Sequence, residues 1–182
     1  MTAPLYAPGP AGVTPPALPP PRTLADRVLF LLLPATCLGC GQPLPARAPL
    51  SLCAPCRSRL APLPAATCAV CARPLAGAGL PAGYLCGRCR ERPPAFDRLL
   101  ALWLYAPPLE AVVRGLKFAR LDYLGPQLGK ALAEGLGDRL QGGDVVVPVP
   151  LHWWRRWGRG YNQAERIAAP LARDLGLPLS SA

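Results

Sequence analysis

Eight cysteines are the residues of this chain whose type and spacing most clearly predict chemistry. They form four Cys-x-x-Cys pairs, all between residues 37 and 89. Two thiolates separated by two residues can bind one ion from a single turn, and two such turns complete a tetrahedral Cys₄ site. The four pairs therefore predict two zinc sites. The predicted ligands are Cys37, Cys40, Cys53, Cys56, Cys68, Cys71, Cys86 and Cys89.

Both zinc ions are expected to be structural, because four sulfur ligands leave no coordination position open for water. Pairing neighbours along the chain puts the first four cysteines in one ribbon and the last four in a second, while a cross-braced arrangement stays open. Two other chemistries compete with zinc. Disulfides belong to secreted chains, and no convincing export signal is present here. Iron–sulfur clusters commonly bring three cysteines closer together than these evenly separated pairs.

The segments between the cysteine pairs contain few large apolar residues and many prolines, glycines and alanines. They are too poor in apolar surface to fold alone, so metal binding is expected to supply the folding free energy, on the order of 10 kcal/mol or more per site. Gly41 and Gly87 lie at or beside the turns, where a left-handed backbone is often required.

The chain before the first cysteine falls into two parts. Residues 1–22 contain eight prolines and almost no charge, which predicts a disordered or polyproline-like tail. A short helix is expected to start at Thr23, and its apolar run ends before Pro34. That run of six residues cannot span a bilayer, which needs about 20, so no transmembrane segment is predicted.

The chain after the last cysteine alternates between strand and helix patterns, which predicts an α/β fold. Residues 99–105 indicate a buried strand, and a helix of about three turns follows Pro108. Leucines every four residues indicate a second helix that ends at Gly137. Residues 144–149 are β-branched and apolar on both faces, as is typical of a strand in the middle of a parallel sheet.

That last strand leads into a loop rich in glycine and arginine, and then into a helix capped by Asn162 with Glu165 three residues on. Such loops are typical of anion sites in α/β folds, because backbone amides and guanidinium groups converge there. Arg155, Arg156 and Arg159 are the expected charge partners. The alternative is a solvated basic loop whose three tryptophans pack on the surface or at an interface.

The formal net charge of +10 and the isoelectric point near 9.7 favour anionic partners. Nucleic acid, phosphorylated metabolites and anionic membranes all qualify. Biased composition in an arginine-rich chain is the competing explanation, since charge alone reports non-specific attraction. His152 is the only histidine, and it is expected to be a hydrogen-bonding loop residue and not a general base.

The chain resembles the ComF family, phosphoribosyltransferase-like proteins associated with DNA uptake in bacterial competence. The resemblance covers nearly everything from about residue 24 onward and rests on the order and number of several motifs. Besides the further cysteine pairs, they are Cys37-Leu-Gly-Cys40-Gly, Cys86-Gly-Arg-Cys89, Pro93-Pro-Ala-Phe-Asp97, Leu116-Lys-Phe118, Val147-Pro-Val-Pro-Leu-His152 and Arg159-Gly-Tyr-Asn-Gln-Ala-Glu165.

This resemblance implies an N-terminal double zinc ribbon followed by a type I phosphoribosyltransferase-like parallel-sheet domain, here incomplete. The expected division is a tail over 1–22, a short helix plus double zinc ribbon over 23–92, and the N-terminal part of the transferase-like domain over 93–182. The resemblance also implies that the loop after the first strand faces pyrophosphate. The loop candidates are Pro148, Val149, Pro150, Leu151, His152, Arg155, Arg156, Arg159, Gly160, Asn162 and Gln163.

Family members carry a later strand that ends in two acids, followed by a loop for the 5′-phosphate of the ribose. Neither occurs in this sequence, so the chain is expected to be truncated and inactive as a transferase. Magnesium and phosphoribosyl pyrophosphate are expected only in full-length relatives. The leading hypothesis is a cytoplasmic, zinc-bearing protein associated with DNA uptake. The rival is a zinc-ribbon module that binds single-stranded DNA or docks a helicase-like competence partner.

Overall fold

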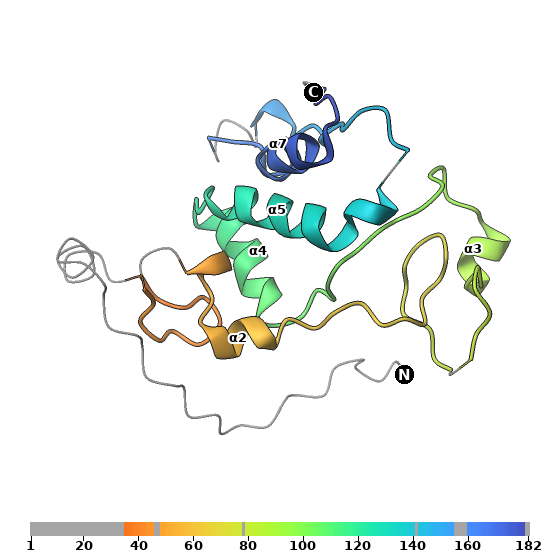
Figure 1. The fold of residues 1–182 in the computed structure, drawn as a ribbon, viewed down its shortest axis with the longest axis horizontal. Helices are drawn as coiled ribbons and strands as arrows, with labels where there is room; N and C mark the ends of the chain where they lie inside the picture. Colours follow the sequence, from red (N-terminus) through yellow and green to blue (C-terminus); the bar gives the residue numbers. More distant parts are fainter. Residues whose placement is uncertain (1–34, 46–47, 78, 141, 155–159, 181–182) are drawn as a thin grey trace.

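The computed structural model describes residues 35–45, 48–77, 79–140, 142–154 and 160–180 (Figure 1). The predicted tail over 1–22 and the predicted helix that starts at Thr23 lie outside the described residues. Helices dominate the regular structure. In chain order they are η1 (Pro49–Ser51), α2 (Ala54–Ser58), α3 (Gly87–Glu91), α4 (Leu109–Phe118), α5 (Leu124–Leu136), η2 (Gly137–Arg139) and α7 (Gln163–Leu175).

The helices α4 and α5 confirm the two helices that the leucine and valine spacing predicts. Helix α4 begins directly after Pro108 and buries Leu109, Val112 and Leu116 along one face. Helix α5 ends at Leu136, immediately before Gly137. Apolar residues three or four positions apart share one side of a helix, so each helix has a single face to bury against the core.

Helix α7 is also predicted correctly, and it lies against α5 (Figure 1). Glycines of α5 allow the two helices to pack at close range. A Cβ atom on Gly129 would overlap the Ile167 carbonyl oxygen and lie 2.6 Å from Pro170 Cγ. A Cβ atom on Gly125 would lie 2.5 Å from Arg166 Cβ. Because the two glycines are four residues apart, they form one smooth strip that accepts the backbone of α7.

The prediction of a buried strand over residues 99–105 is wrong. This segment forms one isolated antiparallel bridge, between Trp103 and Pro62, and Tyr105 is 63% exposed. Hydrogen bonds join Leu63 N to Leu102 O at 3.1 Å and Leu104 N to Ala61 O at 2.9 Å. The facing segment carries prolines at 62 and 64, which have no N–H to donate, so the ladder cannot extend.

The prediction that residues 144–149 form a buried strand is wrong about burial. Val145, Val147 and Val149 are 47%, 60% and 75% exposed. Only Val146 pairs, in a parallel bridge with Leu179, and the described ranges contain no regular sheet. No described segment covers the outer side of these valines, so they cannot be buried. The parallel-sheet domain therefore stays a prediction.

The apolar core joins the first cysteine cluster to the helices. Leu44, Leu50 and Leu52, which are at most 5% exposed, lie in one cluster with Val112 of α4 and Leu124 of α5. The expectation of few buried apolar residues is therefore wrong for residues 36–59, called the first ribbon below. These three leucines are buried because they pack against α4 and α5, and not because the ribbon has a core of its own.

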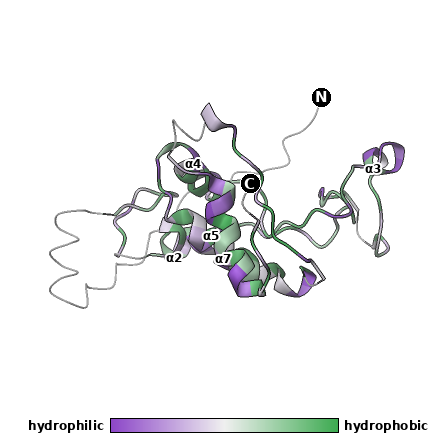
Figure 2. Cartoon of the chain, turned by 90° about the horizontal axis from the view of Figure 1, so that it is seen from above, coloured by the Kyte–Doolittle hydropathy of each residue, from purple (hydrophilic) through white to green (hydrophobic). Residues whose placement is uncertain are grey.

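Residues 67–92, called the second ribbon below, fit that expectation better. Their separate small core consists of three buried cysteines, Cys68, Cys86 and Cys89, with partly buried neighbours. In both Figure 1 and Figure 2 the helix α3 lies apart from the group formed by α2, α4, α5 and α7, and Figure 2 shows it as largely hydrophilic. The second ribbon therefore depends on its metal site far more than the first.

In the described part of the chain, no helix combines the length and the apolar character needed to cross a membrane.

The close packing of α5 on α7 predicts that Gly129→Ala destabilises the protein by about 1–3 kcal/mol, because backbone of α7 has to move. Gly137→Ala is the matched control, since its nearest neighbour, Leu175 Cδ2, would be 3.8 Å from the new methyl group. Urea unfolding of the zinc-loaded protein, followed by circular dichroism at 222 nm, compares the two. Equal stability of both variants would contradict the packing argument.

Candidate metal centres and anion-binding loop

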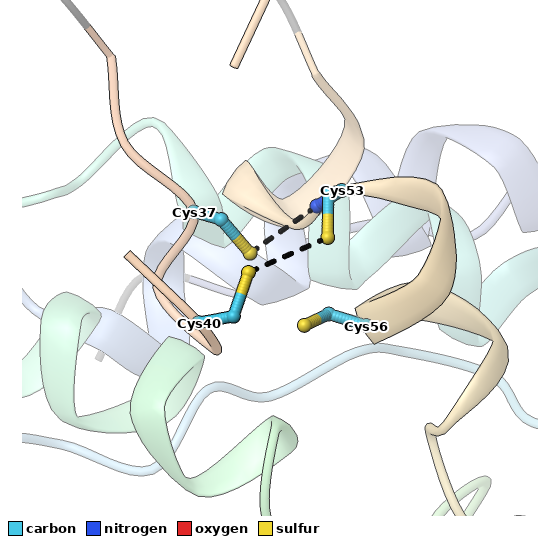
Figure 3. A group of neighbouring side chains, drawn as sticks. All are labelled: Cys37, Cys40, Cys53 and Cys56. Atoms are coloured by element: carbon cyan, nitrogen blue, oxygen red, sulfur yellow. Dashed lines mark hydrogen bonds between the residues drawn. The ribbon is translucent and has the colours of Figure 1, made fainter. Parts of the chain in front are cut away.

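The eight cysteines form two clusters, and each cluster joins neighbouring pairs of the sequence. Within each cluster the four sulfur atoms all lie within 4.8 Å of one another. The cross-braced arrangement is therefore excluded. Figure 3 shows the first centre, in which the four side chains converge from two turns on one point. The first centre is Cys37, Cys40, Cys53 and Cys56, and the second is Cys68, Cys71, Cys86 and Cys89.

The sulfur spacing fits a tetrahedral zinc ion. Four sulfurs about 2.3 Å from one ion are about 3.8 Å from each other. The Cys40 and Cys53 sulfurs are 3.7 Å apart, and those of Cys71 and Cys86 are 3.8 Å apart. None of the eight cysteines is in a disulfide. Sulfurs this close leave room for one ion and not for a cluster of several irons, so two structural zinc ions fit the two centres.

The first turn of each centre is a short hairpin with the same hydrogen bond at its base. Cys37 N donates to Gln42 O at 2.7 Å, and Cys68 N donates to Arg73 O at 2.9 Å. The residue after the second cysteine has positive φ in both, 75° at Gly41 and 54° at Ala72. The prediction of a left-handed Gly41 is confirmed. Ala72 adopts a similar conformation at a steric cost that glycine avoids.

The second turn of each centre opens a short helix. Cys53 is the N-terminal cap residue of α2, and Cys86 has the same position before α3. Gly87 is therefore the first residue of α3, and it is not among the glycines with positive φ. The prediction of a left-handed Gly87 is wrong, because a helix and not a hairpin follows this cysteine.

The two ribbons are an internal duplication, a signal that the cysteine spacing alone does not reveal. Thr36-Cys-Leu-Gly-Cys-Gly-Gln-Pro-Leu44 matches Thr67-Cys-Ala-Val-Cys-Ala-Arg-Pro-Leu75. Leu52-Cys-Ala-Pro-Cys-Arg-Ser-Arg59 matches Leu85-Cys-Gly-Arg-Cys-Arg-Glu-Arg92. Comparing the sequence with itself would have found this repeat and with it the pairing of neighbouring cysteines.

Backbone N–H groups stabilise one thiolate in each centre. Cys53 N donates to Cys37 Sγ, and Cys86 N donates to Cys68 Sγ, both at 3.3 Å. Burial raises the pKa of Cys37, but N–H groups of Cys53, Cys40 and Gly39 outweigh it and lower the pKa to about 7.

In the second centre one thiol has a lowered pKa and another has a raised pKa. N–H groups of Cys71 and Cys86 lower the pKa of Cys68 to about 6. In contrast, burial and the neighbouring sulfurs raise the pKa of Cys89 to about 12. A metal ion that binds here displaces protons from such thiols, so metal affinity is expected to fall as the pH falls.

Gly39 lies inside the first turn of the first centre and faces Cys56 of the second turn. A Cβ atom at this position would lie 2.9 Å from Cys56 Sγ and 3.0 Å from Pro108 Cβ. Only glycine allows both the sulfur and the segment before α4 to approach so closely. Gly87 also lies inside a Cys-x-x-Cys pair, but a Cβ atom there would have no neighbour within 4 Å.

The predicted anion loop is only partly described. Arg155, Arg156 and Arg159 lie outside the described residues. Asn162 is 3% exposed; its side chain accepts from Ala164 N at 3.0 Å and donates to Val149 O at 3.1 Å. It therefore caps α7 as predicted and also ties the helix to the end of segment 144–149.

The other loop candidates lie in different surroundings. Pro148 and Gly160 line the same cavity as Asn162, whereas Val149, Pro150 and His152 are exposed and Leu151 is half-buried. Gln163 is 9% exposed, and its Nε2 atom has no hydrogen-bond partner among the described residues. A buried, unpaired donor is costly, so an acceptor that reached this atom would be stabilising.

The cavity beside the loop has a volume of about 970 Å³ and includes cations that the sequence patterns do not predict. Lys130 comes from α5, and Arg166 and Arg173 come from α7. Arg166 also pairs with Asp122 at 2.7 Å. These side chains meet only because α5 packs on α7, so no local signal in the sequence could have grouped them.

The fold and its paired Cys₄ centres define a double zinc ribbon protein, and the family model of the double zinc ribbon domain matches residues 28–93. The chain is 39% identical over 140 residues to DNA utilization protein YhgH of Salmonella typhi, which covers 69% of this chain and 62% of that protein. It is 36% identical over 151 residues to YhgH of Escherichia coli strain K12, covering 80% and 64%.

A further relative is Competence protein F of Haemophilus influenzae, which is 31% identical over 98 residues, 51% of this chain and 43% of that protein. The double zinc ribbon and the similarity to these relatives support assignment of the chain to the ComF family. It spans less than two thirds of the length of these relatives. No solved structure matches it significantly.

The contact between Gly39 and Cys56 predicts that Gly39→Ala weakens zinc binding at the first centre, because the new methyl group displaces a ligand sulfur. We expect a loss of at least about tenfold in affinity, as for other changes that misorient metal ligands. Gly87→Ala is the matched control and should retain both ions. Zinc content after dialysis against a graded chelator measures the difference, and equal retention by the two variants would contradict the geometry.

Proposed function

We propose that the chain contributes a pyrophosphate-binding loop to a phosphoribosyltransferase-like protein, and that the double zinc ribbon supports this loop. The protein would act in the cytoplasm, in the uptake and utilization of DNA. The names of the relatives, DNA utilization protein and Competence protein F, support the association with DNA. The chemistry of the site supports the choice of ligand. The observation that carries the proposal is the arrangement of residues 144–180 around α7.

Two short extended segments, one on each side of α7 in the chain, pair in parallel at Val146 and Leu179. Val146 N donates to Pro178 O, and Ser180 N donates to Val146 O, both at 2.9 Å, in the parallel bridge with Leu179. Helix α7 forms the crossover between these two segments. In open α/β folds, ligands bind outside the carboxyl ends of such strands, next to the N-terminus of the following helix.

The groups at that position suit an anion with several oxygens. The N-terminus of α7 presents backbone N–H groups and the positive end of the helix dipole. Gln163, the first residue of α7, supplies a buried side-chain donor beside the cavity wall. Lys130, Arg166 and Arg173 line the adjoining cavity together with Glu165, and Arg166 also pairs with Asp122. Pyrophosphate matches this set, because it needs many donors and strong charge neutralisation.

Magnesium, when bound with pyrophosphate, would supply further neutralisation of the phosphate oxygens. The protein groups described here would orient and neutralise the anion. Binding of the pyrophosphate moiety is the part of the proposed function that these groups carry.

This proposal predicts that the zinc-loaded chain binds magnesium pyrophosphate, and that Gln163→Leu weakens binding about tenfold because one donor to a charged acceptor is lost. Gln42→Leu in the first ribbon is the matched control, since it makes the same uncharged replacement away from the loop. Isothermal titration calorimetry with magnesium pyrophosphate measures the affinities. Absence of binding by the unaltered chain, or equal affinity of the two variants, would contradict the site.

A second candidate function, binding of single-stranded DNA, is favoured by two exposed tryptophans. Trp153 and Trp154 are each 64% exposed, and their rings meet edge to face with centroids 5.2 Å apart. Exposed aromatic faces can stack on bases while basic residues follow the phosphates. Two zinc–tetrathiolate centres would lower the formal net charge from +10 to about +6, which is still strongly basic.

For this second function, Trp153→Ala with Trp154→Ala is expected to weaken binding of a labelled oligothymidine by about 1–3 kcal/mol for each lost stack. Tyr105→Ala is the control, because Tyr105 is 63% exposed on a different segment. Fluorescence anisotropy at several salt concentrations separates stacking from charge. If the double tryptophan variant and the Tyr105 variant both bind the oligothymidine as tightly as the unaltered chain, the DNA is held by diffuse charge attraction and not by stacking.

A further inference from the structure

The two metal centres differ in how far their sulfurs are open to solvent. In the first centre Cys40 is exposed and Cys53 is half-buried. Their counterparts in the duplicated second ribbon are Cys71, which is half-buried, and Cys86, which is 6% exposed. Since both centres use four cysteines in two Cys-x-x-Cys pairs, access and not ligand type distinguishes them.

A cavity of about 290 Å³ lies against the open side of the first centre. It is large compared with a small peroxide, since one water molecule occupies about 30 Å³ in the liquid. The positively charged side chain of Arg59 contributes to its wall and can stabilise negative charge that develops on a departing oxygen. The cavity is lined by Cys40, Gln42, Cys53, Pro55, Cys56, Ser58 and Arg59.

We propose that Cys40 is an oxidation site for hydrogen peroxide and small organic hydroperoxides, that Cys53 resolves it to a disulfide, and that the first centre therefore loses its zinc before the second. Exposure favours cysteine oxidation, and oxidation becomes a switch where a second thiol lies within reach. Both sulfurs line the cavity and are 3.7 Å apart, so they need to close by less than about 2 Å to reach disulfide length.

The chemistry balances with peroxide as the oxidant. The Cys40 thiolate attacks one peroxide oxygen, an S–O bond forms, the O–O bond breaks, and the departing hydroxide takes up a proton to become water. The Cys53 thiolate then attacks the sulfenic sulfur, an S–S bond forms, the S–O bond breaks, and a second hydroxide is protonated. Two thiolates lose two electrons in total, and one peroxide and two protons become two waters.

Oxidation at the first centre reaches the helical body, because this centre belongs to its core. Cys37 and Cys56 lie in the same apolar cluster as Leu116 of α4 and Leu128 of α5. Once Cys40 and Cys53 are joined, only two ligands remain, and zinc is released from a site that ordinarily needs four. The second centre has its own small cluster, so its loss would leave α4 and α5 in place.

The test uses the full chain with both centres loaded, which elemental analysis establishes before any oxidant is added. Hydrogen peroxide is added in graded amounts, zinc release is followed with a chromogenic chelator, and peptides are mapped by mass spectrometry after alkylation. We expect the first equivalent of zinc to leave with a disulfide between Cys40 and Cys53, while the cysteines of the second centre stay open to alkylation. Simultaneous release from both centres, or oxidation of the second centre first, would overturn the proposal.

Two tryptophan substitutions at equivalent positions of the repeat test the role of the cavity without touching a ligand. Ser58→Trp places a large ring at the first centre, and Glu91→Trp does the same at the second. We expect Ser58→Trp to slow the first phase of zinc release about fivefold or more by reducing access to Cys40. Glu91→Trp should leave that phase unchanged. Equal rates in the two variants would show that access through this cavity does not control oxidation.

Discussion

Tetrahedral coordination by four thiolates is the constraint on which the rest of this structure depends. Each centre joins a hairpin to the N-terminus of a short helix, and neither piece has enough apolar surface to hold that geometry alone. In the first ribbon the same coordination also fixes Leu44 and Leu52 against α4 and α5, so a metal site and an apolar core stabilise each other. In the second ribbon, metal coordination is almost the only interaction that stabilises the fold.

The arrangement of the helices extends this logic to the anion loop. Glycines on α5 let α7 approach until its backbone meets the neighbouring helix, and this contact brings Lys130 and Arg166 to one cavity. Asn162 accepts a hydrogen bond from Ala164 N in α7 and donates one to Val149 O, and so it connects the start of α7 to the end of segment 144–149. The proposed pyrophosphate site thus depends on helix packing as much as on the loop that carries its motif.

Because the ribbon is duplicated, its two copies can have different structural roles. The second copy tolerates alanine at position 72 and valine at position 70, where the first has glycine at 41 and 39. Gly39 is required in the first copy because Cys56 and Pro108 crowd it from both sides. That crowding reflects contact with the helical body, and the same centre leaves Cys40 open to solvent. One copy therefore links metal binding to the rest of the protein, while the other remains a peripheral module.

The sequence by itself determined the features that depend on local spacing. Cysteine pairs with two residues between them predict metal centres, apolar residues three or four apart predict α4 and α5, and Asn162 marks the start of α7, because each signal acts within a few turns of chain. Strand burial was predicted wrongly at 99–105 and 144–149, since an apolar run does not reveal whether a partner covers it. Only the tertiary structure decided which cations meet at the cavity and which sulfur faces solvent, because these depend on contacts between segments far apart in the chain.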